Sequence, residues 1–431
     1  MATPAGLVDV TQFLINAQSL DTNVRTAAEE QLKLFQEQNF PGFIASIASE
    51  LSNNAKPADS RRLAGLVMKN ALDAKEDIRK KELHARWLAL DPTLRQNVRD
   101  AVLSTLHSEL PDVRHTAAMV VAKVAAIDLP RKEWPTLIQA LLANIGAVPP
   151  VTGTRQATLE AMGYVCEEMA AQSDEVLTPQ EVNMILTAVV AGMSSTEPNE
   201  SRLAATTALC NAIEFAVHNF ENDNERNMLM QVVCQGTQSP EIRIRTASFE
   251  CLHEIAAMYY HKLPAYMTEL YNITVKAVKE DQEEVALQAI EFWSTICDTE
   301  ADLQEDTEAT CHNFIKAASP HLTPILLEQL TKQEEGQEQD DTGWNISMAA
   351  GTCLGLAARV VGSEIVPLVM PFVSANVSKN TGPEDWRLRE AATFAFGLIL
   401  EGPEPLQLMD TAKQALVFLL QVCTGHSSCH F

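Results

Sequence analysis

The sequence predicts an all-α fold, an α-solenoid superhelix built from about ten helical hairpins. Three observations support this prediction: the apolar residues are mostly aliphatic, one helical pattern recurs along the chain, and other apolar helical segments separate its copies. Hydrophobic residues make up 46% of the 431 residues, but aromatic residues only 6%. That composition favours packed helices over sheets. A chain of this length can form two or three domains, or one elongated array with a continuous core.

The recurring pattern is a helix that opens with a polar residue or proline and carries an arginine in its first turns. Small and aliphatic residues then follow at i, i+3, i+4 and i+7. Four copies are spaced by 41, 47 and 43 residues, as marked by Arg114, Arg155, Arg202 and Arg245. These intervals are typical of two-helix solenoid units, and the unit resembles a HEAT repeat. Similar copies follow as "EEVALQAIEFWSTIC", "NISMAAGTCLGLAARVV" and "WRLREAATFAFGLILEG".

The segments between these copies are apolar helices with starts of their own. They include "PRKEWPTLIQALLANIG" from Pro130, "TPQEVNMILTAVVAGM" from Thr178 and "NERNMLMQVVCQGT" from Asn224. We expect them to be the first helix of each hairpin and the arginine-bearing copies to be the second. Such a hairpin can bury its apolar face only against its neighbours, which predicts a continuous stack.

The charge balance limits the partners. Acidic residues outnumber basic ones by 57 to 32, which gives a formal charge of -25. This disfavours nucleic acid and anionic membranes and favours basic proteins, although a solubilising surface explains the charge equally well. The nine scattered cysteines, a start without a signal-peptide pattern and the lack of an apolar run of 18 residues predict a soluble protein of the cytosol or nucleus.

Motifs that carry catalytic chemistry are missing from the sequence. It contains no Gly-rich phosphate loop, His-Glu-x-x-His pair, nucleophile elbow or paired C-x-x-C, so we expect neither an enzyme nor a cofactor. Cys297 stands beside acids, and core packing is its better interpretation. Metal-type side chains gather in the tail at short spacing, as Cys423, His426, Cys429 and His430. Without a framing fold we interpret them as an incidental tail and expect no metal.

Several strings resemble the importin-β family of nuclear transport receptors. Residues 27–106 contain "AEEQLKLFQEQNFPGFI", "RRLAGLVMKNAL" and "ARWLALDP", which resemble the N-terminal domain of that family. "EWPTLIQALLANI", "EVALQAIEFWSTICDTE" and "WRLREAATFAFGLILEGP" extend the resemblance over about residues 8–416 and point to a classical receptor of fungal type. The tail departs from it, because "VCTGHSSCHF" stands where a second helix is due. This predicts a fragment or a truncated gene model.

The resemblance implies a non-catalytic nuclear import receptor of the cytoplasm, the nucleus and the nuclear pore. Its expected partners are Ran-GTP, importin-α through its basic segment, Phe-Gly nucleoporins and basic nuclear cargo, with no nucleic acid and no membrane. The main alternative is a HEAT-repeat scaffold of the phosphatase-subunit type. We divide the chain into four parts. Residues 1–20 begin the first hairpin, and residues 21–106 form an importin-β N-terminal-type domain. Residues 107–404 form a HEAT array with an acidic loop at 333–343, and residues 405–431 form a truncated hairpin with a divergent tail.

An acidic segment precedes one predicted second helix. Its acids are Glu334, Glu335, Glu338, Asp340 and Asp341. Trp344 follows them, and an indole ring can stack on the guanidinium or ammonium group of a basic partner. The resemblance implies that the acids contact Ran and the basic segment of importin-α, and that Trp344 and Trp386 face basic cargo or importin-α. A solvated insertion and a helix-capping tryptophan are the alternatives.

Two consecutive first helices carry apolar residues at helical spacing. Leu186 and Val190 lie at i, i+4 on one, and Met228 and Leu229 follow Glu225 at i+3 and i+4 on the next. Side by side, these helices form a shallow hole for one Phe ring, although family members commonly carry an aromatic residue in place of Met228. Ordinary core packing is the alternative. The resemblance implies a site for Phe-Gly nucleoporins made by Leu186, Thr187, Val190, Glu225, Met228 and Leu229, and it adds Tyr266 as an aromatic residue of a neighbouring pocket.

A further expectation concerns Ran. Lys69 and Asn70 in "LVMKNAL" match a Lys-Asn pair that recurs on the family's Ran-facing second helices. The resemblance therefore adds both residues to the Ran contacts implied for the acidic segment. A lysine that only opposes a helix dipole is the alternative.

Overall fold

The computed structural model describes residues 7–146, 152–172, 176–306, 310–333, 344–379, 381–382 and 385–404, together with 409 and 413. Every regular element in these residues is an α-helix or a short 3-10 helix. The helices follow one another as antiparallel pairs, so the all-α solenoid expected from the sequence is confirmed. The chain divides into two compact units, 1–232 and 233–431, and the division falls inside α13.

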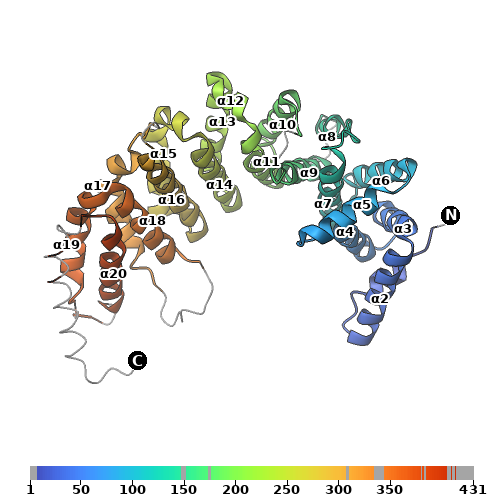
Figure 1. The fold of residues 1–431 in the computed structure, drawn as a ribbon, viewed down its shortest axis with the longest axis horizontal. Coiled ribbons are helices and arrows are strands. Elements are labelled where there is room, and N and C mark those ends of the chain that lie inside the picture. The colour runs from blue at the N-terminus through green and yellow to red at the C-terminus, as the bar shows by residue number, and fades with distance from the viewer. Residues whose placement is uncertain are drawn as a thin grey trace. The chain divides into compact units, whose positions relative to one another are not determined.

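The first unit begins with a pair of helices and continues with four hairpins. Its helices are α1 (Thr11–Asn16), α2 (Thr22–Gln38), α3 (Phe40–Ser52), α4 (Ala58–Leu72), α5 (Asp77–Leu88), α6 (Pro92–Thr105), α7 (Pro111–Asp128), α8 (Leu137–Ile145), α9 (Thr152–Ala170), α10 (Pro179–Gly192), α11 (Asn199–Ala212), α12 (Val217–Glu221) and the first part of α13 (Asp223–Gly236) (Figure 1). Helices α3–α4, α6–α7, α8–α9 and α10–α11 are the hairpins, and their second helices pack against one another in chain order.

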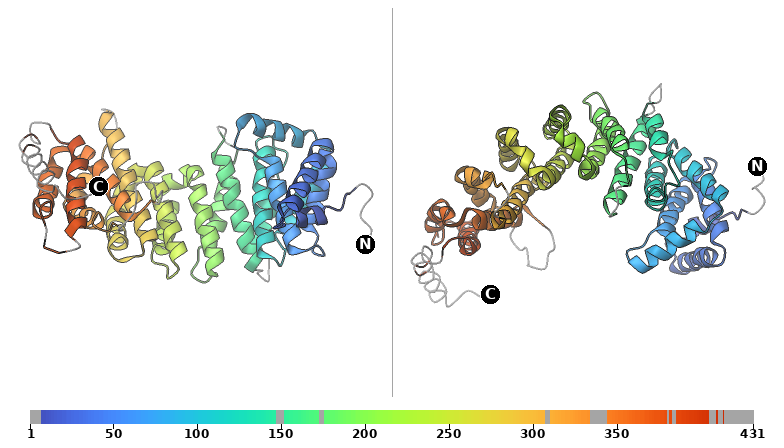
Figure 2. Two further views of the ribbon diagram at one scale, coloured as in Figure 1. Left: turned by 90° about the horizontal axis from the view of Figure 1, so that it is seen from below. Right: turned by 45° about the horizontal axis from the view of Figure 1, so that its top comes forward.

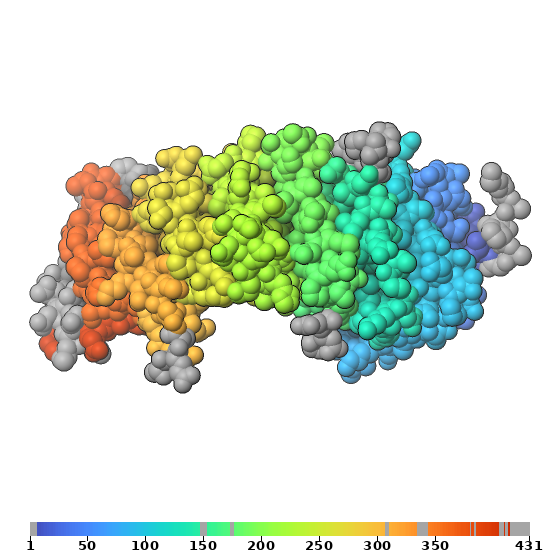
Figure 3. All heavy atoms as spheres, turned by 90° about the horizontal axis from the view of Figure 1, so that it is seen from above, coloured from blue at the N-terminus to red at the C-terminus, as the bar shows by residue number. Residues whose placement is uncertain are grey.

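The second unit repeats this plan. After the end of α13 it contains α14 (Ile242–Tyr259), α15 (Met267–Glu280), α16 (Glu283–Glu305), α17 (Phe314–Gln329), α18 (Ile346–Val361), α19 (Val366–Asn376) and α20 (Asp385–Leu398) (Figure 2). The second helices α14, α16, α18 and α20 again pack in sequence. Within each unit the repeats therefore adjoin as bands in chain order, as the space-filling view shows (Figure 3).

The stacking of second helices depends on small side chains. A Cβ atom added at Gly163 in α9 would lie 3.0 Å from the Cα atom of Ala208 in α11. Ala205 and Ala208 in α11, like Ala117 and Ala125 in α7, are at most 1% exposed. Small side chains let the backbones approach, so each hairpin closes the apolar face of the one before it.

The recurring arginine has a structural role at the turn between the two helices of a pair. Nη1 of Arg25, Arg114 and Arg245 donates to the carbonyl oxygen six residues earlier, at 3.0, 2.8 and 2.8 Å. Each acceptor lies just beyond the end of the preceding helix, where backbone carbonyls lack an intrahelical partner. In these three pairs the arginine thus ties the second helix to its own turn, whereas Arg155 pairs with Glu197 instead.

A buried ion pair anchors α5, the helix that lies between two hairpins. Asp128 at the end of α7 is fully buried, and its carboxylate accepts from Nη2 of Arg99 in α6 at 2.6 Å. Nε1 of Trp87 in α5 donates to the other carboxylate oxygen at 2.9 Å. One side chain therefore holds three helices together through two hydrogen-bonding partners.

One apolar stretch, Ile346–Asn376, meets the length and hydropathy of a membrane span. It consists of α18 and α19, which are separated by a 3-10 turn that starts at Gly362 with φ +64°. Helix α18 packs on α16, α17 and α20, and α19 packs on α17 and α20. The stretch therefore contributes part of the apolar core of two consecutive repeats.

We expect Asp128→Asn to lower the free energy of unfolding by about 3 kcal/mol, because it removes the buried carboxylate that pairs with Arg99 at 2.6 Å and leaves only the Glu133 carboxylate, 3.9 Å from Nη2, as a counter-charge. Asp112→Asn, at an exposed acid in the first turn of the same helix, is the matched control and should cost less than about 1 kcal/mol. Urea unfolding followed by circular dichroism measures both variants, and hydrogen exchange locates the change in α5–α7. Equal midpoints for the two variants would contradict this role of Asp128.

Candidate functional site

A cleft of about 780 Å³ lies between α10 and α13, the first helices of the fifth and sixth pairs, within the first unit. It brings together the six residues expected at the Phe-Gly site. The six are Leu186, Thr187, Val190, Glu225, Met228 and Leu229. The rest of the lining includes Leu142 from α8, Met184 and Ala191 from α10, and Asn219 from α12.

Helix caps set the register of the two walls. At the start of α10, the hydroxyl of Thr178 accepts from the Glu181 backbone N–H, and the Glu181 carboxylate accepts from the Thr178 N–H. Before α13, the side-chain oxygen of Asn222 accepts from the backbone N–H groups of Asn224 and Glu225. These caps fix where each helix begins, and thus which residues face the cleft.

The cleft has an apolar floor and a more exposed rim. Leu186 and Leu229 are each only 4% exposed and form the floor. Val190 is half-buried, whereas Met228 is 57% exposed and stands on the rim. A flat apolar group laid between Val190 and Met228 would therefore lose water on both faces.

The polar end of the cleft offers hydrogen-bond acceptors. The carboxylate of Glu225 accepts from Nδ2 of Asn219 at 2.7 Å and from Nδ2 of Asn222 at 3.2 Å. The hydroxyl of Thr187 donates to the backbone oxygen of Asn183 at 2.7 Å. A carboxylate has about four acceptor positions, and a hydroxyl keeps its lone pairs when it donates. The Glu225 carboxylate and the Thr187 oxygen can therefore accept peptide N–H groups.

Tyr266 is the aromatic residue that was expected in a neighbouring pocket. It is half-buried at the N-cap of α15 in the second unit and does not line this cleft. The two residues expected to contact Ran, Lys69 and Asn70, lie in the last turn of α4, a second helix. Lys69 is half-buried and Asn70 exposed.

The acids at 334–341 lie outside the described residues, but the tryptophan that follows them is described. Trp344 is 49% exposed, and its Nε1 donates to a carboxylate oxygen of Glu291 in α16 at 3.2 Å. Asn345 caps α18 by accepting from the backbone N–H of Met348 at 2.9 Å. The indole therefore opens a second helix and lies beside an acid of the neighbouring second helix.

Trp386 differs from Trp344 in its surroundings. It is half-buried in the first turn of α20, and the guanidinium carbon of Arg387 lies 5.2 Å from the centre of its ring. The ring thus already has a cationic neighbour from its own chain.

The expectations about metals and cysteines have different outcomes. Among the residues that the structure describes, no three or more His, Cys, Asp or Glu side chains are arranged to hold a metal ion. The tail residues Cys423, His426, Cys429 and His430 lie outside that part of the chain. Cys297 is 1% exposed, and burial raises the pKa of its thiol well above the usual value, which confirms core packing.

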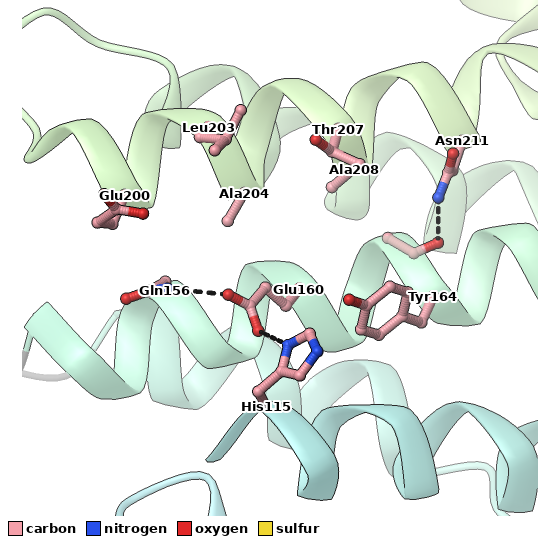
Figure 4. Close-up of a pocket in the computed structure, with 11 residues that line it drawn as sticks. His115, Gln156, Glu160, Tyr164, Glu200, Leu203, Ala204, Thr207, Ala208 and Asn211 are labelled. Atoms are coloured by element: carbon pink, nitrogen blue, oxygen red, sulfur yellow. Dashed lines mark hydrogen bonds and ion pairs between the residues drawn. The ribbon is translucent and has the colours of Figure 1, made fainter. Parts of the chain in front are cut away.

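A second hollow, of about 160 Å³, lies between the second helices α9 and α11 and was not predicted from the sequence (Figure 4). Its acid, Glu160, accepts from Nε2 of Gln156 at 2.9 Å and lies 3.1 Å from Nδ1 of His115. The hydrogen bond to Glu160 raises the pKa of His115. Because its polar groups come from three different helices, no local sequence pattern marks this hollow.

Comparisons with protein-family models match two segments of the chain. Residues 28–108 match the importin-beta N-terminal domain. Residues 135–324 match the HEAT repeats of a model described as stalled ribosome sensor GCN1-like. Together these matches cover the first repeats and the array that contains the cleft.

Curated relatives align with nearly the whole chain. Importin subunit beta-1 of Arabidopsis thaliana is 56% identical, and the alignment covers 98% of this chain and 49% of the relative. Importin subunit beta-1 of Schizosaccharomyces pombe is 42% identical, and the alignment covers 95% of this chain and 48% of the relative. The chain thus spans about half the length of these relatives. The higher identity to the plant protein gives no support to the expected fungal type.

Solved structures agree in fold. A structure of Kap95p bound to RanGDP has a TM-score of 0.83 at 34% identity, and a Kap95:Nup1 complex has 0.81 at 34%. The alignment with each structure covers 98% of this chain and 49% of the chain in that structure. Relatives up to 56% identical over nearly the whole chain, and solved structures of the same fold, show that the chain belongs to the importin-β family.

Proposed function

We propose that the chain acts as a nuclear import receptor that binds Phe-Gly nucleoporins, Ran-GTP, and basic cargo or the basic segment of importin-α. The observation that carries the proposal is the cleft between α10 and α13, which gathers six residues selected from sequence alone. The similar solved structures include Kap95 complexes with Nup1 and with RanGDP, which supports both kinds of partner. Membership of the importin-β family favours this receptor over a phosphatase-type scaffold.

The cleft suits a single phenyl ring attached to a short peptide. Its floor is aliphatic, its rim residues Val190 and Met228 can contact the ring, and Glu225 and Thr187 can accept from peptide N–H groups. Full burial of one Phe side chain contributes roughly 1.5–3 kcal/mol, so one such site binds weakly. A partner with many Phe-Gly repeats gains avidity by rebinding, while each contact stays short-lived.

The charged partners suit the second helices. Trp344 and Glu291 offer an indole and a carboxylate side by side, and a formal charge of -25 attracts basic proteins before contact. The acidic segment at 333–343 supplies further negative charge beside Trp344. Lys69 and Asn70 on α4 are part of the proposed Ran surface, and Trp344 and Trp386 of the basic-cargo surface.

Each of these steps is binding and release, so the proposed function includes no catalysis. A receptor of this kind moves between cytoplasm and nucleus and meets Phe-Gly repeats at the nuclear pore. The remaining residue of the Phe-Gly proposal, Tyr266 at the N-cap of α15, is proposed to line a second pocket for a Phe ring.

Val190→Asp should weaken binding to a Phe-Gly repeat peptide by about tenfold or more, because a carboxylate facing an apolar ring without a partner costs a few kcal/mol. Binding to Ran-GTP should stay within about twofold, since no Ran contact is proposed in the cleft. Val24→Asp, at a valine 39% exposed on α2, is the matched control. Fluorescence anisotropy with labelled peptide measures the affinities. Equal affinities for both variants would refute the proposed site.

Replacement of the five acids at 334–341 by Ser should slow association with Ran-GTP and with a basic importin-α segment, most at low salt. Charges on a surface are screened over roughly 8 Å at physiological ionic strength, so the difference should shrink as salt rises. Stopped-flow kinetics across a salt series measures it. The charge-matched control replaces five exposed acids of the first unit that do not lie on a second helix, Glu76, Asp77, Glu82, Asp100 and Glu214. If both five-site variants associate alike, the segment has no docking role.

Trp344→Ala should weaken binding of the basic importin-α segment by about 1 kcal/mol, because the indole supplies a cation–π contact. This loss should depend little on salt, in contrast to the loss caused by removing the acids. Phe13→Ala, at an aromatic residue 36% exposed on α1, is the control for general loss of surface aromatics. Calorimetric titration at two salt concentrations distinguishes a salt-independent loss at Trp344 from the salt-dependent loss at the acids. An unchanged affinity of Trp344→Ala would remove Trp344 from the proposed surface.

A further inference from the structure

We propose that Met228 is a modification site, at which reversible oxidation of the thioether to a sulfoxide lowers the affinity of the cleft for Phe rings. The inference rests on the proposed function of the cleft between α10 and α13. It concerns regulation of that site rather than its existence.

Exposure singles out Met228 among the methionines that the structure describes. At 57% its exposed fraction is the largest of them, followed by Met409, Met348 and Met258 at 46, 45 and 43%. Neither Met348 nor Met258 lines the cleft. Thioethers open to solvent are the ones that peroxides reach, so Met228 is positioned to react early.

Other methionines near the cleft are better protected. Met184 lines it but is half-buried, while Met193 and Met230 are 9% and 2% exposed. Oxidation at Met228 also leaves the repeat core intact, because its side chain projects from α13 rather than into the core. The modification can therefore change the binding surface without unfolding the repeat.

The oxidant in this step is a peroxide. The sulfur lone pair attacks the distal peroxide oxygen, the O–O bond breaks, and a sulfur–oxygen bond forms. The thioether loses two electrons, and with hydrogen peroxide the other product is water. A methionine sulfoxide reductase reverses the change with electrons from thiols.

The sulfoxide places a strong dipole where the ring would lie. A thioether is polarizable and makes favourable contacts with aromatic rings, whereas a sulfoxide oxygen requires a hydrogen-bond donor. The nearby amide of Asn219 already donates to the Asn183 side-chain oxygen and to Glu225. Water would therefore remain bound at the sulfoxide, and the rim would no longer be dry against a phenyl ring.

The experiment compares wild type, Met228→Leu and Met184→Leu before and after graded hydrogen peroxide. Mass spectrometry of peptides measures the sulfoxide at each methionine, and anisotropy measures affinity for the Phe-Gly peptide. We expect the wild type and Met184→Leu to lose about tenfold in affinity as Met228 oxidises, and Met228→Leu to lose less than about twofold. Treatment with sulfoxide reductases should restore the wild type.

Three results would overturn the inference: an equal loss in Met228→Leu, full affinity with Met228 fully oxidised, or a Met228 that stays reduced while Met184 reacts. Failure of the proposed function looks different. In that case the untreated wild type would not bind the peptide, and Val190→Asp would change nothing. The helical circular dichroism of the oxidised protein must match that of the untreated protein, because a loss of helix would show that the effect is unfolding.

Discussion

The close stacking of the second helices is the constraint on which the rest of the structure depends. Where Gly163 of α9 meets Ala208 of α11, there is no room for a further methyl group without movement. Each hairpin is too thin to enclose a core alone, so its apolar face is buried only when the next second helix lies against it. The first helices form the other layer, and their weaker mutual packing leaves space for a cleft between α10 and α13.

Buried polar groups fix the register of this stack. In the first unit Asp128 joins α5, α6 and α7 through Trp87 and Arg99. In the second unit the fully buried Glu300 of α16 accepts from the Tyr260 hydroxyl at 2.6 Å and from the backbone N–H of Ile315 at 3.1 Å. A carboxylate at the start of α17 also complements the helix dipole. Apolar contacts would tolerate small slips between repeats, whereas these directional bonds do not.

The sequence predicted the helix pairs well because the signals are local. Arginine followed by small residues at helical spacing marked α7, α9, α11 and α14 as second helices. The succession of second helices also shows which first helices are neighbours, and the family resemblance then assigned Leu186 and Leu229 to one site. The arginine's own bonds, as from Arg114 to the carbonyl of Ser108, were not predictable, because they depend on the path of the turn.

Other features depend on contacts between distant residues and left no pattern in the sequence. Helix α5 has no partner helix of its own, and its place follows from the bond between Trp87 and Asp128, 41 residues apart. The hollow at Glu160 is lined by residues of α7, α9 and α11, which are spread over about two repeats of the sequence. Tyr266, at the N-cap of α15, was assigned to a neighbouring pocket through the family resemblance alone.

The two layers of the solenoid separate two kinds of recognition. The cleft belongs to first helices and is apolar, so its affinity depends on water exclusion and is nearly independent of salt. Trp344 and Glu291 belong to second helices and suit charged partners, whose association depends on ionic strength. The rim of the cleft lies in the first unit and Trp344 in the second, so the proposed oxidation of Met228 changes the apolar surface and leaves the charged one intact.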